Sequence, residues 1–65
     1  MPDNEREFLK FIKDGIKYKK KELKWSNRGV ATWLDGFLCG LSDDYSEEFI
    51  GEVYQLKNYY LEIKD

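Results

Sequence analysis

Residues 30–41 read VATWLDGFLCGL, and the spacing of the apolar side chains in this stretch decides the fold class. They recur at i, i+3, i+4, i+7, i+8 and i+11, which is typical of one face of an amphipathic helix: Val30, Trp33, Leu34, Phe37, Leu38 and Leu41. Residues 25–29, just upstream, indicate a connection in which Ser26 or Asn27 caps the helix. We therefore predict a helix over about residues 28–40.

The same stretch carries a row of small residues beside its apolar face. Gly29, Thr32, Gly36 and Gly40 fall at i, i+3, i+7 and i+11. Each interior glycine costs a helix roughly 0.5–1 kcal/mol relative to alanine, but small residues let two helix backbones approach closely. We predict that aromatic side chains of a neighbouring helix cover this row, within the bundle or across a dimer. The alternative is a frayed helix, or one that ends at Gly40 as a C-cap.

The segment before this helix also has helical spacing. Asn4 and Glu7 resemble a capping box, and apolar residues follow at near-helical intervals: Phe8, Leu9, Ile12, Ile16 and Leu23. We predict a first helix over about residues 4–24. Gly15 is the place where this helix could instead end in a turn.

The segment after residue 41 predicts a third helix over about residues 45–63. Ser42 or Ser46 can cap it, and acidic residues in its first turn suit the positive end of the helix dipole. Its apolar residues recur at intervals of four and three: Phe49, Val53, Leu56, Tyr60 and Ile63.

Three helices joined by short loops predict an all-α three-helix bundle, formed as a single domain by residues 1–65. A chain of 65 residues with one cysteine has no internal disulfide to stabilise it, so its aromatic residues must supply much of the core. The predicted core contains Phe8, Ile12, Ile16, Leu23, Val30, Trp33, Leu34, Phe37, Leu41, Phe49, Val53, Leu56 and Tyr60.

Charge is strongly segregated along the chain. Residues 10–28 hold eight Lys or Arg against two Asp or Glu, a net of +6, whereas residues 29–65 hold two against eight, a net of −6. The pattern favours interaction surfaces, although solvated helix faces explain the same charges more simply. It also allows an antiparallel homodimer in which each basic helix faces the acidic helix of its partner.

Two surfaces are candidates for binding. The first is an acidic and aromatic surface for a protein partner: Asp43, Asp44, Glu47, Glu48, Glu52, Tyr54, Tyr59 and Leu61. The second is a lysine face flanked by aromatic rings, which would bind nucleic-acid phosphates: Lys10, Lys13, Lys17, Lys20 and Lys24, with Phe11, Tyr18 and Trp25. We favour a small regulatory module that binds a protein, with nucleic-acid binding as the alternative. A further alternative is an inhibitor whose carboxylates imitate nucleic-acid charge.

Enzyme chemistry finds no support in the sequence. Histidine is absent, and no nucleophile elbow, phosphate-binding loop, dinucleotide motif or EF-hand pattern occurs. We expect a non-enzymatic protein without a metal or cofactor, and we expect Cys39 to be a small packed hydrophobe.

Cysteine content and hydropathy predict the cellular setting. A single cysteine favours the cytoplasm, and no apolar run is long enough for a membrane span. A composition rich in Lys, Glu, Asp and Tyr resembles that of small accessory proteins of phages and plasmids in AT-rich bacteria.

Overall fold

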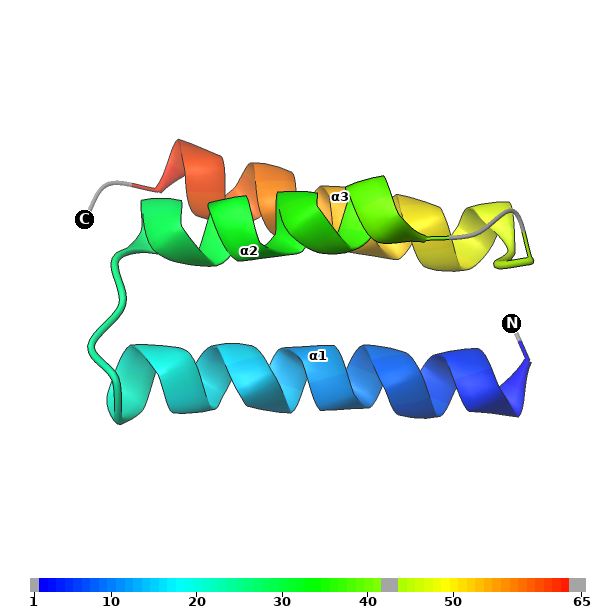
Figure 1. Ribbon diagram of the computed structural model, residues 1–65, viewed down its shortest axis with the longest axis horizontal. Coiled ribbons are helices and arrows are strands. Elements are labelled where there is room, and N and C mark those ends of the chain that lie inside the picture. Colours follow the sequence, from blue (N-terminus) through cyan, green and yellow to red (C-terminus); the bar gives the residue numbers. More distant parts are fainter. Residues whose placement is uncertain (1, 42–43, 64–65) are drawn as a thin grey trace.

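The computed structural model describes residues 2–41 and 44–63, and every regular element among them is a helix. The elements are α1 (Asp3–Lys21), α2 (Asn27–Gly40) and α3 (Glu47–Glu62). Figure 1 shows an up-down-up bundle, in which α1 and α3 run in the same direction and α2 runs against both. The predicted all-α three-helix bundle is confirmed.

The first helix differs from the prediction at both ends. It begins at Asp3, with Pro2 as its N-cap and no side-chain cap, so the expected capping box at Asn4 is wrong. The Pro2 carbonyl accepts the first helical hydrogen bonds, at 3.1 Å, so Asn4 lies inside the first turn and cannot be the N-cap. The helix ends at Lys21, before Lys24, because Lys24 has the left-handed φ of 59° that turns the chain. Gly15 lies inside an unbroken helix.

Serine side chains begin the other two helices. The Ser26 hydroxyl accepts a hydrogen bond from the Gly29 N–H at 3.1 Å, and the Ser46 hydroxyl accepts one from the Phe49 N–H at 3.2 Å. Each hydroxyl thus satisfies a backbone donor that the first helical turn leaves unpaired. The prediction had left two candidate caps for each helix. Of the other candidates, Asn27 is the first residue of α2, and Ser42 lies outside the described residues.

The core lies where the three helices meet. Its buried apolar residues are Leu9, Ile12, Ile16, Val30, Ala31, Leu34, Phe49 and Val53. The other predicted core residues pack half-buried against this cluster, with one exception. Leu23 is 48% exposed, so its predicted place in the core is wrong, because it follows the end of α1. Leu9 and Ala31 are buried although the predicted core omitted them.

The close helix approach at a glycine occurs at Gly15, outside the predicted row of small residues. A Cβ on Gly15 would lie 3.3 Å from Cη2 of Trp33, so the bare α1 backbone makes room for the indole of α2. Gly36 and Gly40 have no such neighbour within 4 Å. The prediction that α1 or α3 covers these two glycines is therefore wrong, and packing across a dimer stays a prediction.

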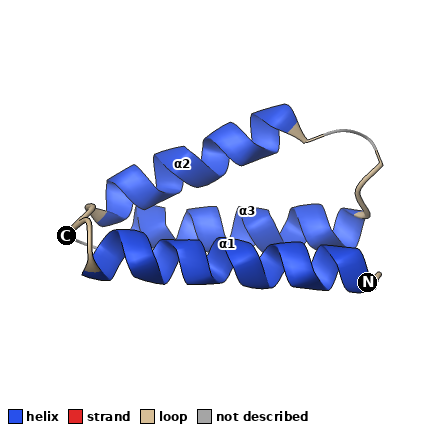
Figure 2. Ribbon diagram, turned by 60° about the horizontal axis from the view of Figure 1, so that its bottom comes forward, coloured by secondary structure: helices blue, strands red, loops and turns tan. Residues whose placement is uncertain are grey.

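The three helices are not equally close to one another. α2 and α3 approach most closely, and Figure 2 shows α2 rising away from α1 and α3 toward its C-terminal end. The side chains of α1 and α2 therefore face each other across a widening angle, and the candidate site lies there.

Candidate functional site

An open apolar groove lies between α1 and α2 at the end where they diverge, and we call it the α1–α2 groove. Its volume is about 630 Å³. The lining comes from α1, from α2 and from the segment before α3: Phe8, Trp33, Gly36, Phe37, Gly40, Leu41 and Tyr45. Exposed apolar hollows of this kind mark binding surfaces more often than isolated exposed side chains do.

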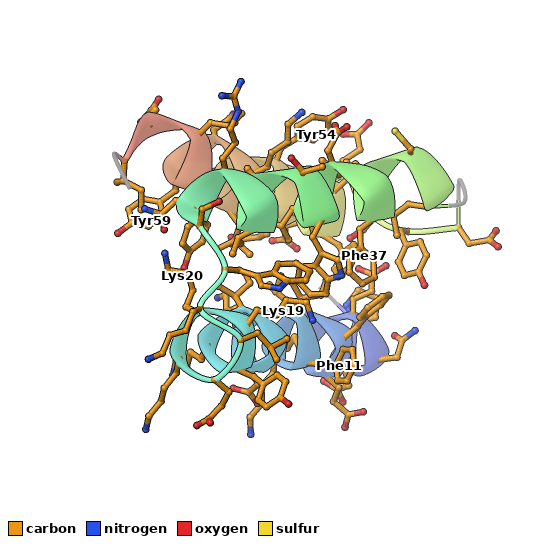
Figure 3. The ribbon with its side chains drawn as sticks, turned by 60° about the vertical axis from the view of Figure 1, so that its left-hand side comes forward. Phe11, Lys19, Lys20, Phe37, Tyr54 and Tyr59 are labelled. Atoms are coloured by element: carbon orange, nitrogen blue, oxygen red, sulfur yellow. The ribbon has the colours of Figure 1, made fainter. Side chains whose placement is uncertain are left out.

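Aromatic packing holds the floor of the groove in place. Phe37 meets Phe8 edge-on at 5.8 Å between ring centroids and meets Trp33 edge-on at 4.8 Å. Figure 3 shows Phe37 pointing from α2 toward α1, on the side of the bundle where Phe11 lies. Phe8 also packs on the fully buried Phe49 at 5.5 Å, so the floor is anchored in the core.

Lys19 contacts Trp33, which lies at the other end of these packed aromatic rings. Its ammonium lies 4.3 Å from the ring centroid of Trp33 and 5.2 Å from that of Trp25. These cation–π contacts, together with the space left by the missing side chain of Gly15, hold the Trp33 indole between α1 and α2. The floor of the groove is therefore formed before any partner arrives.

The α2 wall of the groove is bare backbone. Gly36 and Gly40 line it, and a Cβ on either residue would meet no atom within 4 Å. Further along the same side of α2, Trp25, Ser26, Gly29 and Thr32 line a second hollow of about 430 Å³. The predicted row of small residues thus flanks an open surface, which a partner backbone could approach closely.

One exposed side of α1 alternates carboxylates with aromatic rings, although the residue of α1 that lines the groove is Phe8. At about 100° per residue, its members fall within an arc of about 80° beyond the Gly15–Trp33 contact: Glu7, Phe11, Asp14, Tyr18 and Glu22. All five are exposed, with Phe11 at 66% and Tyr18 at 55%. The sequence prediction assigned the two rings to the lysine face and missed the three carboxylates. The 4, 3, 4, 4 spacing could have revealed them.

The end of the groove near Tyr45 is positioned by a buried carboxylate. Glu5 is 4% exposed, and its two oxygens accept hydrogen bonds from the Ser46 N–H at 2.9 Å and the Ser46 hydroxyl at 2.5 Å. These bonds hold the pKa of Glu5 below its ordinary value, chiefly through the hydroxyl. They tie α1 to the start of α3 and thereby set Tyr45 5.9 Å from Phe8, between ring centroids.

The predicted acidic and aromatic surface is divided among several sides of the molecule. Glu48 and Glu52 line a hollow of about 470 Å³ between α1 and α3, which is also lined by three cationic residues of α1: Arg6, Lys10 and Lys13. The acidic and basic segments of the chain therefore face each other within one molecule.

The remaining residues of that predicted surface lie elsewhere. Tyr54 and Tyr59 point to different sides of the bundle (Figure 3), and Leu61 is exposed further along α3. Asp44 and Glu47 are exposed near the start of α3, and Asp43 lies outside the described residues. The structure does not gather this set into one surface.

The predicted lysine face is only partly formed. Lys10, Lys13 and Lys17 are exposed along α1, but Lys20 donates a hydrogen bond to Oδ1 of Asn27 and Lys24 follows the end of the helix. At about 100° per residue, Phe11 and Tyr18 lie on another side of α1 from these lysines. Phe11 and Tyr18 thus do not share one side of α1 with these lysines, whereas Trp25, the third predicted ring, lies 5.2 Å from the ammonium of Lys19.

Groups that could support other chemistry are few in the described part of the chain. Residues 2–41 and 44–63 contain no cluster of His, Cys, Asp and Glu side chains that could hold a metal ion. Cys39 is an exposed free thiol, so its predicted packing as a hydrophobe is wrong, because it lies on the outer side of α2. Within the same residues, none of the helices has the length and apolar character that crossing a membrane requires.

No protein-family model, curated protein or solved structure matches this chain.

Proposed function

We propose that this chain is a small non-enzymatic interaction module that binds a partner protein in the α1–α2 groove. The observation that carries the proposal is the open aromatic floor beside the bare backbone of Gly36 and Gly40. An apolar floor rewards a partner that buries large side chains there, and a wall without side chains lets the partner approach closely. The floor is also held in place by the aromatic packing on Phe49, which lowers the entropy lost on binding.

The charges beside the groove favour a protein partner over nucleic acid. Phe11 and Tyr18 could stack on bases, but Glu7, Asp14 and Glu22 lie between and beside them and would repel phosphates. Lys10, Lys17 and Lys21 are also exposed and lie within one helical turn of Asp14 or Tyr18. This side of α1 therefore carries mixed charge and not the uninterrupted row of cations that phosphates favour.

Imitation of nucleic-acid charge is also less favoured. A decoy surface needs carboxylates that present one uninterrupted negative patch to a basic cleft. Glu48 and Glu52 instead share their hollow with Arg6, Lys10 and Lys13, which offset their charge.

The proposal can be tested by filling the groove. The double variant Gly36→Leu/Gly40→Leu places two large side chains on the α2 wall, where a Cβ meets no neighbour and the fold should persist. Gly51→Leu on α3 is the matched control, because its Cβ also meets nothing within 4 Å and it does not line the groove. Circular dichroism of each variant verifies that the helices are retained.

The measurement is cross-linked capture from source cells with the intact chain as bait, with and without nuclease treatment. We expect a protein that is captured by the wild type and by Gly51→Leu but lost with the groove-filled variant. Capture that is indifferent to groove filling would overturn the proposal. Capture that depends on nucleic acid and on Lys10, Lys13 and Lys17 would favour the phosphate-binding alternative instead.

A further inference from the structure

A hollow between the C-terminal half of α1 and the C-terminal end of α3 is lined by three lysines. Its volume is about 470 Å³, and its lining consists of Ile16, Lys17, Lys20, Lys21 and Tyr60. Figure 3 shows Lys20 and Tyr59, which precedes Tyr60, on the same side of the bundle. We call this hollow the α1–α3 lysine hollow, and every charged side chain in its lining is a cation.

The same two helices form another hollow, in which the charges are balanced. Nearer the N-terminal ends of α1 and α3, Glu48 and Glu52 line it together with Arg6, Lys10 and Lys13. Because α1 and α3 run in the same direction, the carboxylates at the start of α3 meet the cations of the first half of α1 (Figure 1). The lysines of the second half meet the aromatic end of α3 instead.

The lysines of the α1–α3 lysine hollow are not paired with carboxylates of the described residues. Lys17 and Lys21 are exposed and form no ion pair within residues 2–41 and 44–63. Lys20 is half-buried and donates a hydrogen bond to Oδ1 of Asn27, which holds its ammonium in place. Asp14 lies one helical turn before Lys17 but does not line the hollow. Lysines in a last turn also suit the helix dipole, but Lys17 lies before the last turn of α1.

The floor of this hollow is apolar and carries one phenol. Ile16 is 3% exposed, and Tyr60 is half-buried, with its ring edge-on to that of Tyr59 at 5.0 Å between centroids. Burial, and to a lesser extent the neighbouring Tyr59, raises the pKa of Tyr60, so its hydroxyl stays protonated at neutral pH. The hollow therefore places an apolar surface beside three positive charges, which is complementary to an anion attached to an apolar group.

We propose that the α1–α3 lysine hollow binds a small organic phosphate, a phosphomonoester carried by an aromatic or other apolar group. A phosphomonoester has close to two negative charges at neutral pH, so three ammoniums attract it roughly twice as strongly as they attract a carboxylate. Lysine binds phosphate as a point charge, whereas a carboxylate suits the planar fork of arginine, and the lining contains no arginine. The apolar group would cover Ile16 and the ring of Tyr60. The site is separate from the α1–α2 groove, so this inference does not depend on the proposed function.

Phenyl phosphate is the probe, and inorganic phosphate, benzoate and phenol test its separate parts. Each is titrated into the intact chain in Tris buffer at about 0.15 M salt, where long-range attraction is screened beyond about 8 Å. Binding is followed by the amide NMR signals of Ile16 and Tyr60.

Two double variants separate the hollow from the general charge of α1. Lys17→Gln/Lys21→Gln removes two lysines of the α1–α3 lysine hollow. Lys10→Gln/Lys13→Gln is the matched control, because it makes the same change of charge on the same helix but in the balanced hollow. Circular dichroism verifies that both variants keep their helices.

We expect phenyl phosphate to move both amide signals and to bind at least about five-fold more tightly than inorganic phosphate, because its ring buries apolar surface. Benzoate, with one charge, should bind several-fold more weakly than phenyl phosphate, and phenol should not bind. Lys17→Gln/Lys21→Gln should weaken phenyl phosphate at least about five-fold, whereas the control should change its affinity less than about two-fold.

Three results would overturn the inference. Equal weakening by the two double variants would show that only the net charge of α1 attracts the probe. Equal affinity for phenyl phosphate and inorganic phosphate would remove the role of the apolar floor. Titration with phenyl phosphate that leaves the signals of Ile16 and Tyr60 unmoved, while vesicles of phosphatidic acid bind the chain, would assign the lysines to a membrane surface instead.

Discussion

Replacing Gly36 and Gly40 with alanine should stabilise the free protein, and the size of the gain can be calculated. Neither residue has a left-handed φ, and a Cβ on either meets nothing within 4 Å; Gly36 lies inside α2, whereas Gly40 is its last residue. Gly36→Ala then gains about 0.5–1 kcal/mol of helix stability, Gly40→Ala gains less because it lies at the helix end, and the double variant gains about 1 kcal/mol.

The corresponding change in melting temperature is large because the protein is small. For 65 residues, at about 2.1 cal/mol/K of unfolding entropy per residue, the total entropy is about 0.14 kcal/mol/K. The double variant should therefore melt about 7 °C above the wild type. Thermal unfolding followed by circular dichroism, at several protein concentrations, measures this shift.

Two further glycines calibrate the result. Gly51→Ala should raise the melting temperature by about as much as Gly36→Ala alone, since both lie inside a helix and a Cβ on either meets nothing within 4 Å. Gly15→Ala should gain less, because its Cβ would press on Trp33 at 3.3 Å. A fall in melting temperature for Gly36→Ala/Gly40→Ala would refute the reasoning. If that fall also depended on protein concentration, it would support the predicted packing of these glycines across a homodimer.

Three other changes probe the turns and caps. Lys24→Gly should stabilise the protein by about 1 kcal/mol in urea unfolding, because glycine adopts the left-handed φ without strain; Lys24→Ala, which keeps the Cβ, should show no such gain. Ser26→Ala should cost about 1 kcal/mol of capping. Ser46→Ala should cost more in the same assay, because it also removes a donor to Glu5, and an equal cost would contradict this role. Because the pKa of Glu5 is lowered in the folded protein, its carboxylate stabilises the fold fully when the pH is above the unfolded pKa of about 4.3. This stabilisation is lost as the pH falls through the lower folded pKa. Glu5→Gln should flatten that part of the acid-unfolding curve.

The helices were predictable because their apolar spacing and serine caps are local signals. Periodicity alone places four residues correctly in the core: Val30, Leu34, Phe49 and Val53. The limits of α1 were less predictable, because they depend on the extended backbone of Pro2 and on the left-handed turn at Lys24, which propensity does not specify.

The candidate site was harder to predict because it depends on how helices are placed around one another. The sequence identified the glycines of α2 as unusual but assigned them to close packing. The glycine that packs closely against another helix is Gly15, and its partner Trp33 is 18 residues away in the sequence. Without that contact, the side of α1 that borders α2 is unknown, so Phe8 could not be assigned to a groove shared with Gly36 and Gly40.

α2 packs more closely on α3 than α1 packs on either helix, and this difference affects how the chain folds. α2 and α3 are consecutive in the chain and approach most closely. Their hairpin therefore forms many stabilising contacts at the small entropy cost of closing a short loop, and it should form early. α1 is attached to α3 by a Glu5–Ser46 contact that spans 41 residues, and such distant contacts form late. Detachment of α1 is then the easiest partial unfolding step, and amide exchange at Ile12 and Ile16 should be faster than at Leu34 and Val53.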